Sequence, residues 1–316
     1  MRFIQKAVAC LWIFAVPFNM HLSKAQTNIN TGWEVYGGSK KSIRYSSLKQ
    51  INTTNVKQLQ VAWIYHTEDA DVKGLSQIQC NPIIVNGILY GTTPRLSLIA
   101  LNAATGEQKW IFKPETYLGK EVALGLNNSR GVTYWQSGKD KRVLYGAGSN
   151  VYELNAETGE LIKEFGKNGA INLHDDLELT NKSTYIAATS PGIIYKDLYI
   201  VGGRVNESAN AAPGSIRAFD VRTGKLRWIF HTIPHPGEFG YNTREDKEAW
   251  KHIGGANCWS GFSMDEKRGI LFAPTGSASF DFYGGKRLGA GLFANSLLAL
   301  DAATGKLKWH YQSYPS

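Results

Sequence analysis

Cysteine and charged side chains are both scarce in this sequence. Only 3 of the 316 residues are cysteine, which excludes a small domain stapled by disulfide bonds. Charged residues make up 19%, whereas 43% are hydrophobic and the chain holds 9 Trp, 15 Tyr and 13 Phe, which excludes a disordered chain. The 33 glycines argue against a long coiled coil or helical array. Many glycines together with many aromatic residues favour a β-rich protein with many turns.

The sequence also lacks any concentrated run of basic residues. Lys and Arg number 35 against 26 Asp and Glu, so the formal net charge is +9. The basic residues occur singly or in pairs such as Lys40-Lys41, with no run of five or more. We therefore predict no nucleic-acid partner and interpret the charge as a cationic surface. The length allows one large domain or two ordinary ones.

The N-terminal apolar run, residues 7–18, is too short to span a bilayer comfortably. It follows Arg2 and Lys6 and precedes small residues at 23–25, so residues 1–25 are predicted to be a secretory signal peptide. We expect a periplasmic protein with no stable transmembrane span after signal cleavage. A retained anchor helix is the alternative.

Two cysteines, Cys80 and Cys258, remain in the predicted mature chain of residues 26–316. An exported compartment would let them pair, but the sequence does not show that they are close. We expect two buried free thiols.

One pattern recurs four times in the mature chain. A short apolar strand ends at Asp or Asn, two residues and Thr-Gly follow, and a second strand carries aromatic residues. Gly supplies the positive φ of a tight turn and the Asx side chain caps it, so each copy predicts a β-hairpin. The Thr residues of the four Thr-Gly pairs are 53, 65 and 81 residues apart, periods that suit four-stranded propeller blades with insertions. The copies span residues 97–112, 151–165, 215–230 and 296–311.

Further hairpins fit between these copies. Residues 81–90 turn at Asn86-Gly87, residues 192–201 turn at Lys196-Asp197, and residues 47–60 can hold one short helix. The predicted fold class is all-β, a β-propeller. The repeat tryptophans are predicted to pack between blades rather than touch a ligand, and the second copy has Glu164-Phe165 in place of its tryptophan. These tryptophans are Trp110, Trp228 and Trp309.

The repeat resembles the blades of the pyrroloquinoline quinone (PQQ) dehydrogenases. The segments 33–38, 92–95 and 282–285 extend the resemblance, which is closest to the glucose dehydrogenase-like branch. It implies an eight-bladed propeller, of which residues 26–316 form about the first half, four to five blades. It also implies PQQ and a Ca²⁺ or Mg²⁺ ion at the propeller axis. The implied function is oxidation of an aldose sugar or an alcohol, with electrons passed to a quinone or cytochrome.

The resemblance assigns roles to seven positions. Arg130 matches an arginine that pairs with a PQQ carboxylate, Thr189 a hydroxyl that hydrogen-bonds the cofactor, and Trp259 the tryptophan beneath its ring. Glu207 matches a metal-binding carboxylate, which suits a hard cation. The other three positions depart from relatives: Gln79 replaces a Glu beside the cofactor, Ser277 a metal-binding Asn, and Arg95 a His of the sugar site.

The aspartate that serves the family as catalytic base is expected beyond Ser316, so no residue here is assigned that role. We therefore expect a C-terminally truncated chain that is inactive by itself. The alternatives are an exported non-catalytic propeller scaffold and a sugar-binding module. The set Arg130, Thr189, Glu207 and Trp259 argues against both, because neither has a reason to keep it.

Overall fold

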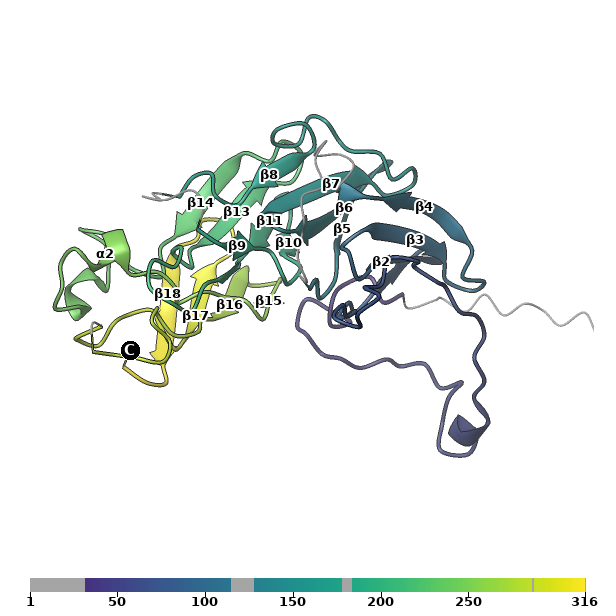
Figure 1. The fold of residues 1–316 in the computed structure, drawn as a ribbon, viewed down its shortest axis with the longest axis horizontal. Helices are drawn as coiled ribbons and strands as arrows, with labels where there is room; N and C mark the ends of the chain where they lie inside the picture. Colours follow the sequence, from purple (N-terminus) through teal and green to yellow (C-terminus); the bar gives the residue numbers. More distant parts are fainter. Residues whose placement is uncertain (1–31, 115–127, 178–183, 286, 316) are drawn as a thin grey trace, which may run out of the picture. The chain divides into compact units, whose positions relative to one another are not determined.

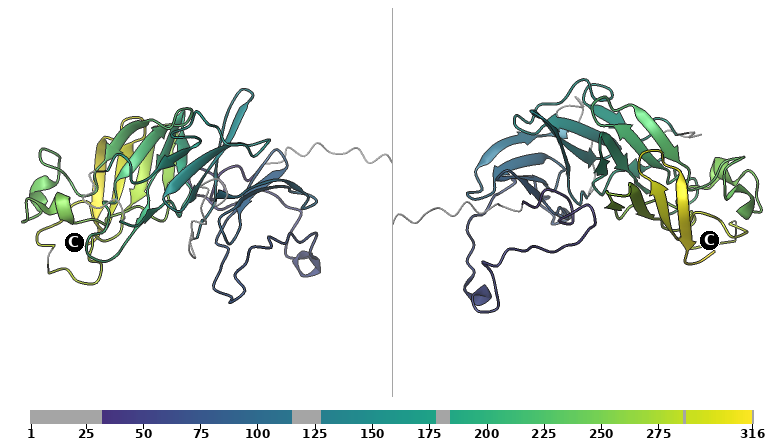
Figure 2. Two further views of the ribbon diagram at one scale, coloured as in Figure 1. Left: turned by 45° about the horizontal axis from the view of Figure 1, so that its top comes forward. Right: turned by 180° about the vertical axis from the view of Figure 1, so that it is seen from behind.

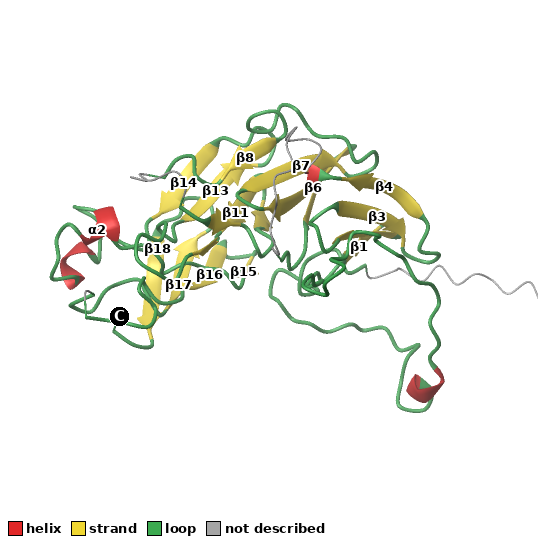
Figure 3. Cartoon of the chain, in the orientation of Figure 1, coloured by secondary structure: helices red, strands yellow, loops and turns green. Residues whose placement is uncertain are grey.

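The chain is described by a computed structural model that covers residues 32–114, 128–177, 184–285 and 287–315. Strands and loops make up nearly all of this part of the chain (Figure 3). The described helices are short: η1 (Val56–Gln58), η2 (Tyr241–Thr243) and α2 (Ala249–His252). None of them is long and apolar enough to cross a membrane. Helix η1 falls within the helix predicted at 47–60, and the predicted signal peptide, residues 1–25, lies outside the described residues.

Four antiparallel sheets of four strands follow one another in chain order in the described part of the molecule (Figures 1 and 2). Blade 1 contains β1 (Ile83–Val85), β2 (Ile88–Thr92), β3 (Leu98–Asn102) and β4 (Gln108–Phe112). Blade 2 contains β5 (Thr133–Ser137), β6 (Asp140–Ala147), β7 (Asn150–Asn155) and β8 (Ala170–Asn172).

Blades 3 and 4 repeat the arrangement. Blade 3 contains β10 (Ile193–Tyr195), β11 (Leu198–Val201), β13 (Ile216–Asp220) and β14 (Leu226–Phe230). Blade 4 contains β15 (Ser263–Asp265), β16 (Ile270–Pro274), β17 (Ser296–Asp301) and β18 (Leu307–Gln312). A small ribbon pairs β9 (Ile186–Ala187) with β12 (Arg204–Val205). The all-β fold and its meandering blades are as predicted.

The repeated turns owe their shape to the Asx residue and the glycine. In the first copy, Asn102 Oδ1 accepts hydrogen bonds from the backbone N–H groups of Ala104 and Thr105, at 2.9 and 3.2 Å. Gly106 follows with φ of +74°, a conformation that glycine adopts without steric cost. The same pair of side-chain bonds forms at the other three turns, where the acceptors are Asn155, Asp220 and Asp301.

The repeat tryptophans join one blade to the next. Trp110 Nε1 donates to the carbonyl of Ala156 at 3.1 Å, and its ring lies against Gly159 in the turn of blade 2. Trp228 does the same to the turn of blade 4, with a bond of 3.2 Å to Ala302. This confirms the structural role predicted for both residues. Trp309, on the outer strand of blade 4, is 45% exposed.

Blade 2 differs from the expectation and uses an arginine in place of the tryptophan. Its outer strand is β8, and Phe165, expected on that strand, instead lies fully buried in a loop before it. Arg142 reaches across to blade 3 and donates to the carbonyls of Val221 and Arg222, at 3.4 and 3.2 Å. Val221 occupies the turn position that accepts from tryptophan in the other blades, so the guanidinium replaces the indole N–H.

A methyl group at Gly159 should therefore loosen the contact between blades 1 and 2. Gly159 has φ of +75°, and a Cβ there would lie 2.6 Å from the Trp110 ring. We expect Gly159→Ala to lower the free energy of unfolding by about 2–3 kcal/mol, from left-handed strain plus overpacking. Gly138→Ala is the matched control, since φ is +59° and nothing lies within 4 Å of its Cβ. Equal losses in urea unfolding would show that the ring contact is unimportant.

Candidate functional site

The sheet topology collects the predicted site residues at one end of the blades. In an antiparallel sheet, the start of the first strand and the end of the second lie at the same edge. Four predicted residues precede a first strand and three follow a second strand. They are Gln79, Arg130, Thr189 and Trp259 before β1, β5, β10 and β15, and Arg95, Glu207 and Ser277 after β2, β11 and β16.

Hydrogen bonds between neighbouring blades hold this end together. The backbone N–H of Asn81 donates to the carbonyl of Arg130, and the N–H of Arg130 donates to the carbonyl of Thr189, both at 2.9 Å. Ser190 Oγ then donates to the carbonyl of Trp259 at 2.6 Å. The segments that precede the first strands of all four blades are therefore linked in series.

Arg130 lies at the centre of these links. Its Nη1 donates to Thr189 Oγ1 at 3.1 Å, and its guanidinium carbon lies 5.3 Å from the centroid of the Trp259 ring. Thr189 is buried and Trp259 is 47% exposed. Arg130 forms no ion pair with any described residue, so its charge is not neutralised by a carboxylate in this part of the chain.

This arrangement suits a planar anion. An exposed indole face offers a surface for an aromatic ring, and a guanidinium beside it offers paired N–H donors to a carboxylate. Thr189 and Trp259 also line one small pocket, with Gly202 and Gly203 among its walls. A flat ligand bearing carboxylates, as PQQ does, matches both the surface and the charge.

Gln79 is hydrogen-bonded to the segment that leads into Arg130. Its Oε1 accepts a hydrogen bond of 2.6 Å from Asn128 Nδ2, two residues before Arg130. Its Nε2 donates to Gln77 at 3.0 Å. The structure therefore connects Gln79 to the Arg130 segment through Asn128, and no described hydrogen bond joins the Gln79 and Arg130 side chains.

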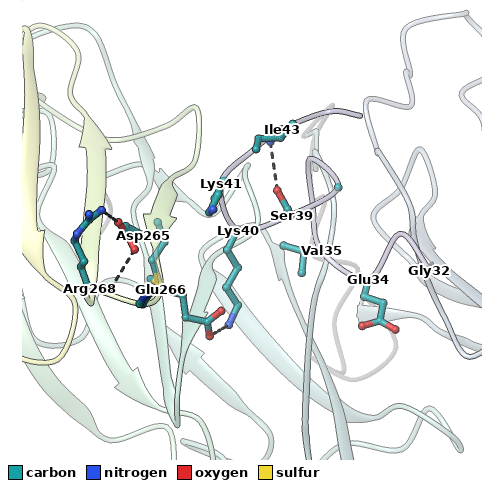
Figure 4. Close-up of a pocket in the computed structure, with 13 residues that line it drawn as sticks. Gly32, Glu34, Val35, Ser39, Lys40, Lys41, Ile43, Asp265, Glu266 and Arg268 are labelled. Carbon is teal, nitrogen blue, oxygen red and sulfur yellow. Dashed lines mark hydrogen bonds and ion pairs between the residues drawn. The ribbon is translucent and has the colours of Figure 1, made fainter. Parts of the chain in front are cut away.

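A segment near the N-terminus, residues 32–43, runs beside the inner strands. Ile84 of β1 donates its backbone N–H to Trp33, and Met264 of β15 donates to Lys40, at 2.9 and 2.7 Å. Lys40 also pairs with Glu266 across a wide pocket between this segment and the β15–β16 turn (Figure 4). None of the seven predicted site residues lines that pocket.

Tyr36 of the same segment is a neighbour of the site that the sequence reasoning missed. A Cβ built at Gly131 would lie 3.0 Å from Tyr36 Cδ2, and one at Gly261 would lie 4.0 Å from its Cε1. These glycines follow Arg130 and Trp259 closely, so the tyrosine ring packs under both site segments. Tyr36 belongs to the segment 33–38 that carried the resemblance, which was the available signal.

The predicted metal-binding residues, Glu207 and Ser277, do not form a complete metal site among the described residues. The carbonyl of Glu207 accepts the backbone N–H of Asp281 at 3.0 Å, and burial together with the Glu207 charge raises the pKa of Asp281. Ser277 uses its carbonyl to accept from Ala256 at 2.6 Å. The described residues contain no group of three or more His, Cys, Asp or Glu that could hold a metal. Calcium takes six to eight oxygen ligands, so these side chains alone would not complete its shell.

Arg95 lies in a different set of contacts. Its Nε donates to the carbonyl of Asp69 at 3.2 Å, and its backbone N–H donates to Asp69 Oδ2 at 3.3 Å. Thr93 Oγ1 donates to the same carboxylate oxygen. No described hydrogen bond or ring contact joins Arg95 to Arg130, Thr189 or Trp259.

Cys80 and Cys258 are free thiols, as predicted, but only Cys258 is buried as expected, whereas Cys80 is partly exposed. Cys258 lies next to Trp259 and is buried, and Cys80 lies next to Gln79. Burial raises the pKa of both thiols, so both stay protonated near neutral pH. Neither is an activated nucleophile.

Blade-like sheets joined by tryptophans, with a cation and an exposed indole at their linked ends, define a quinoprotein-type propeller. The sequence matches the family described as "PQQ: Glucose/ethanol/alcohol dehydrogenase, beta-propeller domain" over residues 33–314. The chain therefore belongs to the PQQ dehydrogenase propeller family.

Similar proteins agree with this assignment. The chain is 32% identical over 306 residues to quinoprotein glucose dehydrogenase A of Acinetobacter calcoaceticus, covering 89% of this chain and 37% of that protein. It is 33% identical over 299 residues to the quinoprotein glucose dehydrogenase of Escherichia coli K12, with the same coverage. A solved quinohemoprotein alcohol dehydrogenase of Pseudomonas putida HK5 superposes with a TM-score of 0.75 at 26% identity, covering 90% of this chain and 40% of that one. The chain thus spans well under half the length of these relatives.

Proposed function

We propose that the chain is the PQQ-holding part of a periplasmic dehydrogenase that oxidises an aldose sugar or an alcohol and passes electrons to a quinone or cytochrome. The observation that carries the proposal is the position of Arg130, held between the Thr189 hydroxyl and the Trp259 ring. The glucose dehydrogenase relatives at 30–33% identity support the sugar, and the alcohol dehydrogenase relatives at 28–30% support the alcohol.

The residues would divide the work of holding the cofactor. Trp259 would support the ring, Arg130 would bind a carboxylate, and the Thr189 hydroxyl would fix the direction of the guanidinium. When bound, PQQ accepts the two electrons removed from the substrate carbon. The pair Glu207 and Asp281 would contribute oxygen ligands to a Ca²⁺ or Mg²⁺ ion, with the rest supplied from outside the described residues.

Binding of PQQ to the purified protein tests this proposal. We expect saturable quenching of tryptophan fluorescence on addition of PQQ with Ca²⁺. The matched control is Trp309→Phe, which removes a half-exposed tryptophan at the outer edge of blade 4 and should leave the affinity unchanged. Absence of saturable binding by equilibrium dialysis would overturn the proposal and favour a scaffold. If PQQ binds, a dye-linked assay with a panel of sugars and alcohols would separate the two substrate classes.

A further inference from the structure

Two arginines with unsatisfied N–H groups lie close together in the loops that precede blade 4 and join its second and third strands. Arg244 belongs to the connection between β14 and β15, near α2, and Arg287 to the connection between β16 and β17 (Figure 1). An isolated β-bridge pairs Arg244 with Gly289, and Glu245 donates its backbone N–H to Leu288 at 3.1 Å. Because alternate residues of an extended segment share a face, Arg244 and Arg287 point to the same side as diagonal neighbours.

Their donors are only partly used. Arg244 Nη2 donates to the carbonyl of Gly291 at 3.1 Å, and Arg287 Nη1 donates to the carbonyl of Ala278. Arg244 Nε and Nη1 and Arg287 Nε are buried and have no hydrogen-bond partner among the described residues. Such orphaned charged donors are costly, since a buried polar group normally finds a partner.

Their charges are also not balanced. Neither arginine forms an ion pair with a described residue. Arg287 nevertheless lies close enough to Asp281 for its positive charge to lower the pKa of that carboxyl, against the larger effect of burial. Arg244 is only 4% exposed, and burial together with the Arg287 charge lowers its pKa to about 10. The Arg244 guanidinium therefore remains cationic at neutral pH, close enough to Arg287 for the two charges to repel.

The position of this pair relative to the site suggests its use. Ala278, which accepts from Arg287, comes two residues after Gly276, and a Cβ at Gly276 would lie 3.7 Å from Trp259 Nε1. Apolar residues from both loops, including Ile253 and Ala294, pack together in one buried cluster. The arginine pair thus lies at the same end of the blades as Arg130, beside the segment that flanks the indole.

We propose that Arg244 and Arg287 form an anion subsite that binds the carboxylate of a small polyhydroxy acid. Guanidinium groups present paired donors that match the two oxygens of a carboxylate. The subsite deepens the proposed function, on which it rests, by naming an acidic sugar or polyol as the substrate class. Its own binding of a carboxylate does not require PQQ.

Calorimetric titration with sodium gluconate, at fixed ionic strength, tests the subsite. We expect saturable binding that Arg287→Gln weakens about 10- to 100-fold, the loss typical of hydrogen bonds to a charged group. Arg268→Gln is the matched control, because that arginine is exposed and pairs with Asp265 elsewhere on blade 4. Arg130→Gln should leave gluconate binding unchanged while it weakens PQQ binding, so failure of one proposal is distinguishable from failure of the other.

Two control ligands and a stability measurement test whether the subsite is specific for a carboxylate. Sorbitol, a neutral polyol, and inorganic phosphate are titrated alongside gluconate. In thermal unfolding without ligand, Arg287→Gln should match or exceed the wild-type Tm because it removes a repulsion, which a purely structural arginine would not do. Equal binding of sorbitol, binding of phosphate alone, or gluconate affinity unchanged in Arg287→Gln would each overturn the proposal.

Discussion

Replacing Trp259 with alanine is expected to weaken PQQ binding about 10- to 100-fold. The 47% exposed indole offers the described site its aromatic surface, and stacking a ring on an aromatic side chain is worth about 1–3 kcal/mol. Fluorescence quenching would lose its main reporter in this variant, so equilibrium dialysis is the measurement of choice. Trp259→Phe keeps an aromatic face and should lose less than tenfold.

Arg130 should show coupling to this effect. Its guanidinium carbon lies 5.3 Å from the Trp259 centroid, so the two side chains would contact one ligand together. Arg130→Gln removes the charge and should also weaken PQQ about 10- to 100-fold, through lost charge-assisted hydrogen bonds. In a double-mutant cycle, the combined loss should differ from the sum of the single losses. Unchanged affinity in both single variants would remove PQQ from this site.

The blades could be predicted because their signals are local. The turn at Asn102 needs only a capping side chain, two residues and Thr-Gly, all adjacent in sequence, and the structure forms it as expected. The hairpin tip at Asn86-Gly87 is equally local, with φ of +50° and +79°. Each such element follows from backbone conformations that only a few residue types adopt.

Contacts between blades are not encoded locally, and there the prediction was weaker. The sequence shows that the second repeat lacks a tryptophan, but not that Arg142 from the preceding strands takes its place. The sequence likewise does not show that the outer strand of blade 2 begins only at Ala170 and covers Ala170–Asn172. These features depend on pairings between residues tens of positions apart, which periodicity does not reveal.

The site divides in the same way. Resemblance placed Arg130, Thr189 and Trp259 in one group, and the structure brings these three into contact. The structure also places Glu207 beside Asp281. Arg95, by contrast, donates hydrogen bonds to Asp69, and no described hydrogen bond or ring contact joins it to any of those three residues. The Arg244 and Arg287 pair had no sequence signal, because two isolated arginines in separate loops look like ordinary surface residues until the loops are folded together.

Replacing Arg142 of blade 2, whose side chain is 11% exposed, is expected to have the other large effect. Arg142 bonds Glu153, which is fully buried, at 2.8 Å, and also the carboxylate of Asp140. Arg142→Met would leave Glu153 buried without its partner and remove the bonds to blade 3. We expect a loss of about 3–5 kcal/mol in the free energy of unfolding at pH 8, where Glu153 is half ionised in the wild-type protein, and a smaller loss at pH 5, where it is protonated. The exposed Arg227, replaced by methionine, is the control and should cost under about 1 kcal/mol.

The pH dependence of stability is expected to show the contribution of Glu153. Burial raises the pKa of Glu153 to about 8, with Arg142 opposing the shift. The folded state therefore binds more protons than the unfolded state between about pH 4.5 and 8, and stability falls as pH rises through that window. Glu153→Gln should flatten this slope, which reaches about 1.4 kcal/mol per pH unit for one group.

A double replacement then separates charge burial from packing. Arg142→Met combined with Glu153→Gln removes both charges, so it should recover much of the loss seen in Arg142→Met alone, most clearly at pH 8. Urea unfolding of the four proteins at pH 5 and pH 8 measures this directly. If the double variant is no more stable than Arg142→Met at pH 8, the loss comes from the missing contacts to Val221 and Arg222, and the buried carboxylate is not the cause.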